Sequence, residues 1–149
     1  MQKKRFTMPV GVIILLIKDE HVFLIKRQNT GYDDGKYATI GGHLDGGETA
    51  TQAVIRETYE EAGVKVQPDD VRFINVSHLV TNTERIHFAF VIENWEGTPT
   101  NTEPEKASDS GWFHLENLPN EINEVSKDVI NSYKNSIFYT ERGWATMSS

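Results

Sequence analysis

Three glutamates between positions 57 and 61 are the first chemical signal in the chain. On a helix, Glu57 and Glu61 lie one turn apart with Glu60 beside them, so the three carboxylates project from roughly one face. Like charges at this spacing repel each other and destabilise a helix. Divalent cations would remove that repulsion, and oxygen ligands suit Mg²⁺ or Mn²⁺. Taken alone, however, the spacing fits a solvated acidic helix face equally well.

A longer pattern around these glutamates favours the metal-binding interpretation. It resembles the Nudix box, G-x5-E-x7-R-E-U-x-E-E-x-G-U, where U is a bulky apolar residue. A chance match in a chain of this length is on the order of one in a million. Thr58 departs from the pattern at an aliphatic position, and Ile40 stands where many relatives have proline. The seven fixed letters fall at Gly42, Glu48, Arg56, Glu57, Glu60, Glu61 and Gly63.

The resemblance covers roughly residues 10 to 135. Within the family, the sequence is most similar in character to the smaller MutT-like members. Beyond the box it includes Lys26-Arg27, Gly35-Lys36-Tyr37 and Leu118-Pro119. It implies an α/β fold, a Nudix-type α/β/α sandwich around a mixed β-sheet. We expect a single domain over residues 1–149, with a C-terminal tail at 136–149.

The resemblance also implies a reaction. Family members hydrolyse a nucleoside diphosphate linked to another group: water attacks phosphorus, and Mg²⁺ neutralises the charge that develops. We expect a Mg²⁺-dependent pyrophosphohydrolase, with Mn²⁺ as a substitute, acting on a nucleoside triphosphate or a related nucleoside diphosphate derivative. Glu48 and Arg56 would tie the glycine loop to the helix and orient the ligands. Carried over by position, the metal ligands would be Glu57, Glu60, Glu61 and the carbonyl of Gly41.

Other functions remain open at this point. A Nudix-like module that senses a nucleotide without cleaving it is the main alternative, but such a module would be expected to lose glutamates of the box. An RNA-end pyrophosphohydrolase is disfavoured, since no basic stretch is evident beyond Lys3-Lys4-Arg5. Dinucleoside polyphosphates and nucleotide sugars remain possible substrates.

A carboxylate outside the box is expected to complete the site. Helix ligands approach a metal from one side, so a group from across the cleft would complete the shell or act as base. The acidic loop before Trp112 offers Glu103, Glu105 and Asp109. We choose Glu105, because similar segments of relatives place a glutamate at this distance from the aromatic strand and Pro104 restrains the chain before it. A solvated acidic loop is the alternative.

Three further residues are candidates for substrate binding. Arg27 at a strand end would contact phosphate, although a surface role fits as well. His43 in the glycine loop would touch substrate, although solvated loop histidines are more common. His87 lies on a strand that would face the pocket, and a structural role is its alternative.

The elements that must position these residues follow from local patterns. Strands are expected at 10–17, 22–25, 37–40, 71–80, 85–93 and 112–115, because these runs are β-branched or aromatic and bounded by turn formers. Residues 41–47 contain four glycines and should form a loop. A helix should begin with a Thr49–Gln52 capping box, bury Ile55, Tyr59 and Ala62, and end at Gly63. A second helix is expected at 121–133.

Composition limits the partners. Lys plus Arg number 15 and Asp plus Glu number 22, which gives a net charge of −7 and argues against binding duplex nucleic acid. The chain has no cysteine, which excludes disulfides and thiolate metal sites and fits a reducing cytoplasm. No apolar stretch approaches the ~20 residues of a membrane-spanning helix. We therefore expect a cytoplasmic monomer or homodimer whose partner is a small-molecule nucleotide, with no membrane association.

Overall fold

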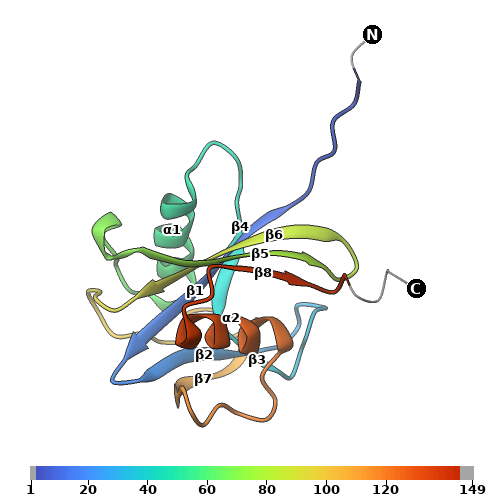
Figure 1. Ribbon diagram of the computed structural model, residues 1–149. Coiled ribbons are helices and arrows are strands. Elements are labelled where there is room, and N and C mark those ends of the chain that lie inside the picture. Colours follow the sequence, from blue (N-terminus) through green and yellow to red (C-terminus); the bar gives the residue numbers. More distant parts are fainter. Residues whose placement is uncertain (1–2, 145–149) are drawn as a thin grey trace.

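The computed structural model describes residues 3–144, which form a mixed eight-stranded sheet with two α-helices (Figure 1). A short 3₁₀ turn, Pro68–Asp70, follows the first helix. The elements in chain order are β1 (Val10–Lys18), β2 (His21–Arg27), β3 (Tyr37–Ala38), β4 (Ile40–His43), α1 (Ala50–Ala62), β5 (Arg72–Val80), β6 (Glu84–Ile92), β7 (Ala107–His114), α2 (Glu124–Asn135) and β8 (Tyr139–Arg142).

Strand β1 lies at the centre of the sheet and pairs with three other strands, β2, β4 and β6. The main path runs β3-β2-β1-β6-β5-β8, while β4 pairs with β1 and β7 with β2. The β1–β6 and β5–β8 pairs are parallel and the other pairs antiparallel, so the predicted mixed sheet is confirmed. The N-terminal half of β1 pairs with β4, and its C-terminal end pairs with β2. The short strand β4 is thereby held against the middle of the sheet.

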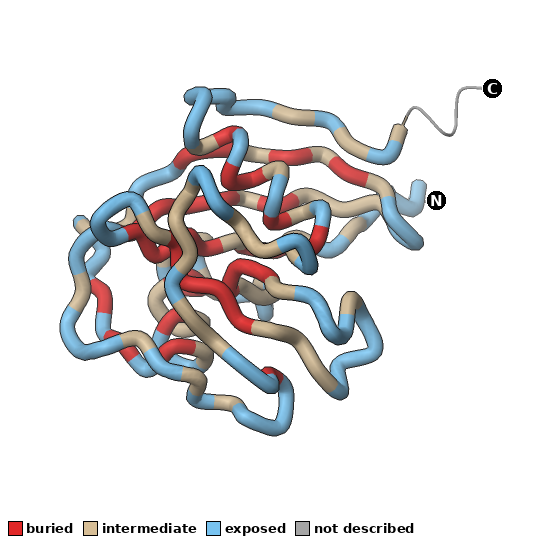
Figure 2. Tube along the Cα trace, turned by 90° about the horizontal axis from the view of Figure 1, so that it is seen from below, coloured by how far each residue is buried: buried red, intermediate tan, exposed pale blue. Residues whose placement is uncertain are grey.

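Side chains on the two faces of β1 belong to two different apolar clusters. Val12, Ile14 and Leu16 point toward α1 and pack with its buried residues, whereas Leu15 and Ile17 pack with Val129 and Ile130 of α2. Because successive side chains of a strand alternate between faces, α1 and α2 cover opposite sides of the sheet. Figure 2 shows the buried segments grouped in the interior and the connecting loops exposed. The predicted α/β/α sandwich is confirmed.

Three predictions about strands were wrong. The expected loop at 41–47 begins later, because Gly41 and Gly42 belong to β4 and pair with β1. Strand β7 starts at Ala107 rather than at 112, since the whole segment pairs with β2. Residues 139–142, expected to lie in a tail, form β8 and pair with β5. Each element depends on a distant partner strand that its own sequence does not reveal.

Both predicted helices exist. Helix α2 begins at Glu124, three residues later than expected, because the side chain of Asn123 caps it by accepting the amide of Ser126 at 3.0 Å. Among residues 3–144, no helix has the length and apolarity that crossing a membrane requires.

Candidate active site

The ends of helix α1 lie where the sequence predicted them. Thr49 and Gln52 form the predicted capping box, and Gly63 ends the helix in the left-handed region at φ 73°. The predicted apolar stripe was partly wrong, since Tyr59 is exposed and Ile55 only half-buried. The buried residues of the helix are instead Ala53, Val54, Thr58 and Ala62.

Thr58, which occupies an apolar position of the box, is still packed in the core. Thr58 is fully buried, and its hydroxyl donates to the carbonyl of Val54 at 2.7 Å. The polar group therefore has a partner within the helix, and the methyl group packs inward. The substitution does not disturb the turn that carries the glutamates.

Glu57 and Glu61 project from α1 toward β4. The side chain of Glu57 is 13% exposed, and Glu61 accepts the backbone N–H of Gly41 at 3.2 Å. Gly42 has no side chain, and a Cβ there would clash with the Glu57 carboxylate. Glycine at this strand position thus lets the carboxylate approach the backbone.

Glu60 differs from its neighbours. Its side chain is 51% exposed and lies 3.6 Å from Nη1 of Arg56. Within residues 3–144, no three acidic or histidine side chains already converge as a metal site. The predicted ligands therefore share a cleft, but in this structure they do not form a closed coordination shell.

Burial makes the carboxylate pair electrostatically costly. It raises the pKa of Glu57, partly offset by the Arg56 guanidinium. Burial, followed by the charge of Glu57, raises the pKa of Glu61 well above its usual range. Two close carboxylates in one cleft cannot both ionise at ordinary cost without a counter-charge. This is an electrostatic environment that a cation would stabilise.

Arg56 connects the helix to the glycine segment. Its Nη2 donates to Oε1 of Glu48 at 2.7 Å, and its Nε donates to Oε2 of Glu48 at 3.2 Å. It also donates to Oε1 of Glu57 at 2.6 Å and to the carbonyl of His43 at 3.2 Å. The structure brings Glu48, Arg56 and the glycine strand together as the sequence predicted, and the bidentate contact fixes the guanidinium in one plane.

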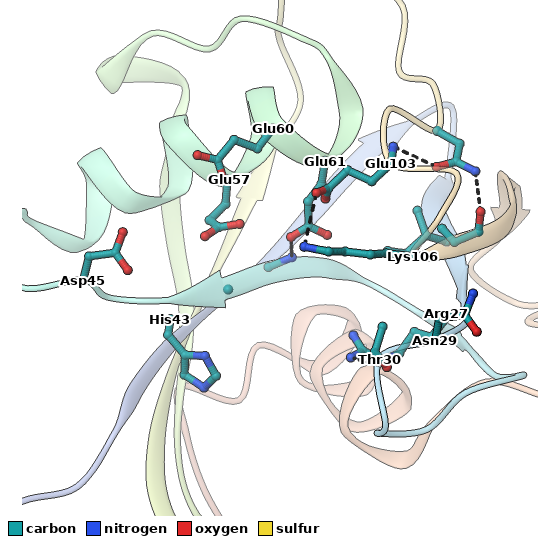
Figure 3. Close-up of a pocket in the computed structure, with 15 residues that line it drawn as sticks. Arg27, Asn29, Thr30, His43, Asp45, Glu57, Glu60, Glu61, Glu103 and Lys106 are labelled. Carbon is teal, nitrogen blue, oxygen red and sulfur yellow. Dashed lines mark hydrogen bonds and ion pairs between the residues drawn. The ribbon is translucent and has the colours of Figure 1, made fainter.

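The opposite wall of the cleft comes from the loop before β7. Glu103 lies there with Oε2 3.6 Å from Nζ of Lys106, and its charge contributes to the raised pKa of Glu61. The loop is tied to α1, since the hydroxyl of Thr102 donates to the carbonyl of Glu60. Figure 3 shows Glu103 and Lys106 facing Glu61 across the cleft.

Glu105 is not among the residues that line this cleft. Its side chain is exposed, and its backbone carbonyl accepts Nδ2 of Asn29 at 3.2 Å. The geometry therefore gives no support to the choice of Glu105 and places Glu103 opposite the helix glutamates. The sequence had offered both residues, but the direction of each side chain depends on how the loop turns into β7.

Of the three residues expected to contact substrate, Arg27 and His43 line the cleft and His87 does not. Arg27 lines the cleft, with its guanidinium held by the carbonyl of Tyr32 at 2.8 Å and the hydroxyl of Thr30 at 3.1 Å. His43 lies at the end of β4, and its ring points away from the glutamates (Figure 3). His87 is absent from the residues lining the cleft and lies in a second pocket.

The cleft has a volume of about 590 Å³ and contrasting walls. Carboxylates project from α1, and the opposite side of the cleft carries the cationic groups of Arg27 and Lys106, with Glu103 paired to Lys106 at 3.6 Å. Cations bound by the acidic wall and phosphate oxygens bound by the basic wall would fit side by side. The arrangement suits chemistry on a polyanion.

Comparison with known proteins agrees with the sequence pattern. The NUDIX domain family matches residues 7–133. A NAD-capped RNA hydrolase NudC from Stutzerimonas stutzeri is 30% identical over 109 residues, which is 73% of this chain and 37% of that protein. The NudC of Escherichia coli O9:H4 is 28% identical over 108 residues, 72% of this chain and 40% of that protein. The matched region thus spans about two fifths of these relatives.

Solved structures share the fold. A MutT NUDIX hydrolase from Burkholderia pseudomallei superposes with a TM-score of 0.77 at 24% identity, covering 83% of this chain and 96% of that one. A NUDIX hydrolase from Nitrosomonas europaea gives a TM-score of 0.74 at 20% identity, covering 89% and 93%. Because the family match extends over most of the 149 residues, the chain belongs to the Nudix family.

Proposed function

We propose that the chain is a Mg²⁺-dependent pyrophosphohydrolase that cleaves a nucleoside triphosphate or a related nucleoside diphosphate derivative by water attack on phosphorus. The observation that carries the proposal is the Glu57–Glu61 pair, two half-buried carboxylates of raised pKa in a cleft that Arg27 and Lys106 also line. Family membership supports the same reaction.

The donor set fits a hard divalent cation. The expected ligands are all oxygens, and Arg56 is the cation that contacts the carboxylate of Glu57. Glu57, Glu60, Glu61 and the carbonyl of Gly41 would hold the ions. When bound, Mg²⁺ or Mn²⁺ would neutralise charge on the phosphates and make a bound water easier to deprotonate.

Side chains of the protein would orient the ligands, bind the phosphates and help remove the proton. Arg56 and Glu48 hold the helix against β4, and the amide of Gly41 orients Glu61. Arg27 and Lys106 are placed to bind phosphate oxygens from the basic wall. In this proposal Glu103, rather than Glu105, is the carboxylate that approaches from across the cleft and helps remove the proton of the attacking water.

A nucleotide screen tests the proposal. Purified protein is incubated with a mixed library of nucleotides and Mg²⁺, and released phosphate and pyrophosphate are followed. We expect turnover of at least one nucleoside diphosphate derivative and loss of that turnover in excess chelator. Tight binding without turnover of any compound would instead support the sensor module. Full turnover in chelator would contradict the role of the metal.

The names of the curated relatives favour a second candidate substrate. They are called NAD-capped RNA hydrolases, so NAD and NAD-capped RNA belong in the screen. NAD contains the pyrophosphate that the proposed reaction requires. A net charge of −7 opposes binding of a long polyanionic RNA, and the absence of duplex nucleic acid among the partners remains part of the proposal. Preference for NAD-capped RNA over free nucleotides would contradict the expectation that an RNA end is a poor substrate.

A further inference from the structure

The loop at residues 101–107 brings Glu103 and Lys106 to the cleft that the α1 glutamates line, called here the carboxylate cleft. Residues 101–106 belong to no helix or strand, and β7 begins only at Ala107. Regular secondary structure therefore does not fix the direction of the Glu103 side chain. Its direction depends on the contacts that the loop makes with itself and with its neighbours.

The side chain of Asn101 closes this loop on itself. Its Nδ2 donates to the carbonyl of Ala107 at 2.7 Å, and its Oδ1 accepts the backbone N–H of Glu103 at 3.2 Å. Asn101 is half-buried and lies at the wall of the carboxylate cleft. One side chain thus joins the backbone of Glu103 to the first residue of β7.

Asparagine is chemically suited to both contacts. Its side chain often accepts an amide two residues further on, as it does here from Glu103. The second contact, to Ala107, needs a donor, which aspartate lacks when ionised. Because backbone groups already engage both polar atoms of the amide, Asn101 is better suited to holding the loop than to binding substrate.

The backbone of Glu103 is held on its other side as well. Its carbonyl accepts the amide of Lys106 at 2.9 Å and the amide of Ala107 at 3.0 Å. Together with the contact to Asn101, these bonds restrain both polar groups of the Glu103 backbone. The side chain then extends from a fixed point and faces Glu61 across the carboxylate cleft (Figure 3).

Separate contacts dock the loop onto α1. The hydroxyl of Thr102 donates to the carbonyl of Glu60, and the amide of Thr100 donates to the carbonyl of Ala62 at 3.0 Å. These bonds do not involve the side chain of Asn101. Removing that side chain should therefore change the direction of the loop carboxylate without releasing the loop from the helix.

We propose that Asn101 is a positioning residue for the hydrolysis: it joins the amide of Glu103 to the start of β7 and so holds the Glu103 carboxylate where it accepts the proton of the attacking water. The inference rests on the proposed function, which supplies the role of Glu103, and adds to it the contact that places this carboxylate. Because Asn101 acts through Glu103, its removal should matter only while Glu103 is present.

Amide hydrogen exchange tests the contact without any turnover. The full chain is studied by NMR in chelator and without nucleotide. Asn101→Ala removes both contacts, and Asn101→Leu removes them while keeping most of the side-chain volume. We expect the Glu103 amide to exchange about tenfold faster in both variants than in wild type, because it loses its acceptor.

Gln28→Ala is the matched control for the exchange experiment. The Nε2 of Gln28 donates to the carbonyl of Pro104 at 2.7 Å, so this variant also removes a side-chain amide that contacts the loop. Gln28 does not line the carboxylate cleft and does not contact the amide of Glu103. The Glu103 amide should exchange in Gln28→Ala as it does in wild type.

A double-mutant cycle tests the role of Asn101 in turnover. With Mg²⁺ and the best nucleotide, Asn101→Ala should lower kcat about fivefold or more and change KM less than about twofold. In the Glu103→Gln background the same substitution should change kcat less than about twofold, because the carboxylate that it positions is already absent. Gln28→Ala should change kcat less than about twofold in either background. Thermal melts set a temperature at which every variant is folded.

The outcomes separate the two proposals. An unchanged exchange rate of the Glu103 amide in both Asn101 variants would show that Asn101 does not hold the loop. Effects of Asn101→Ala and Glu103→Gln that multiply, or a loss confined to KM, would overturn the positioning role while leaving the hydrolysis in place. Wild-type protein that turns over no nucleotide would instead overturn the proposed function, and with it the role of Asn101, even where the exchange data confirm the contact.

Discussion

Glu61 is a residue whose environment in the cleft should lower the stability of the fold when it ionises. Its carboxylate is held by the amide of Gly41, yet burial and the charge of Glu57 raise its pKa. A group whose pKa is raised by folding favours the folded state while it is protonated. That contribution is lost as the pH rises through the raised pKa. Without a cation, the ionised pair should therefore destabilise the fold.

Glu61→Gln should separate the two effects. Gln keeps the volume but cannot ionise, so turnover should fall about a hundredfold or more. In chelator, the melting temperature of the wild type should fall relative to that of the variant as pH rises from mildly acidic to alkaline. Thermal melts across pH and steady-state kinetics measure both. Glu60→Gln should lower turnover without this change in stability, because that side chain is 51% exposed.

The surface residue Glu96 provides the control for this experiment. It is exposed and lies away from the cleft, so Glu96→Gln should alter neither turnover nor the pH dependence of melting. If Glu61→Gln retained activity within a factor of two of wild type, its assignment as a metal ligand would be wrong.

Glu103 and Glu105 form a second residue-level test. Glu103 lines the cleft and influences Glu61, whereas Glu105 is exposed. Glu103→Gln should lower kcat by about tenfold or more through lost help in removing the proton of water, while Glu105→Gln should have little effect. Steady-state kinetics on both variants decides between them. Sensitivity at Glu105 alone would restore the choice made from sequence.

At the scale of elements, prediction succeeded where the signals were local. The capping box of α1, its terminal glycine and the spacing of its glutamates all lie within one helix, and each was read from sequence. Strands β4, β7 and β8 were missed or shortened because their ladders depend on residues far away in the chain. The orientation of Glu103 depends on the same non-local pairing, so the sequence could not show which carboxylate of the loop lines the cleft.

Strand β8 gives a prediction at this scale. It pairs with β5, and the amide of Val76 donates to the carbonyl of Phe138 at 2.9 Å just before the strand. Truncation after Ile137 should cost about 1 to 3 kcal/mol of unfolding free energy and expose the β5 edge to self-association. Denaturant unfolding and light scattering measure these effects.

The same truncation should leave the chemistry intact. Among the described residues, none from β5 or β8 lines the carboxylate cleft, so kcat of the folded fraction should stay within a factor of two. A truncation after Trp144 keeps β8 and is the matched control. Loss of turnover without loss of stability would mean that β8 reaches the active site.

The charge of the whole molecule would add to the need for a cation in the proposed reaction. In that reaction a chain with a net charge of −7 would bring a polyanion into a cleft that already holds several carboxylates. Divalent ions reduce both repulsions at once, and salt alone only screens them. The helix, the glycine strand and the loop before β7 each contribute to this cleft, so cation binding should link the stability of all three.

Adding Mg²⁺ should therefore raise the melting temperature, and the increase should be larger at pH 8 than at pH 6. Protons compete for the Glu57–Glu61 pair because its pKa values are raised, so apparent metal affinity grows as the pair ionises. Tighter binding to the folded state then gives greater stabilisation. Thermal melts with Mg²⁺, compared with NaCl at equal ionic strength, measure the effect, and Mn²⁺ should substitute for Mg²⁺. An equal increase with NaCl, or a larger increase at pH 6, would show that the carboxylate pair is not where the cation binds.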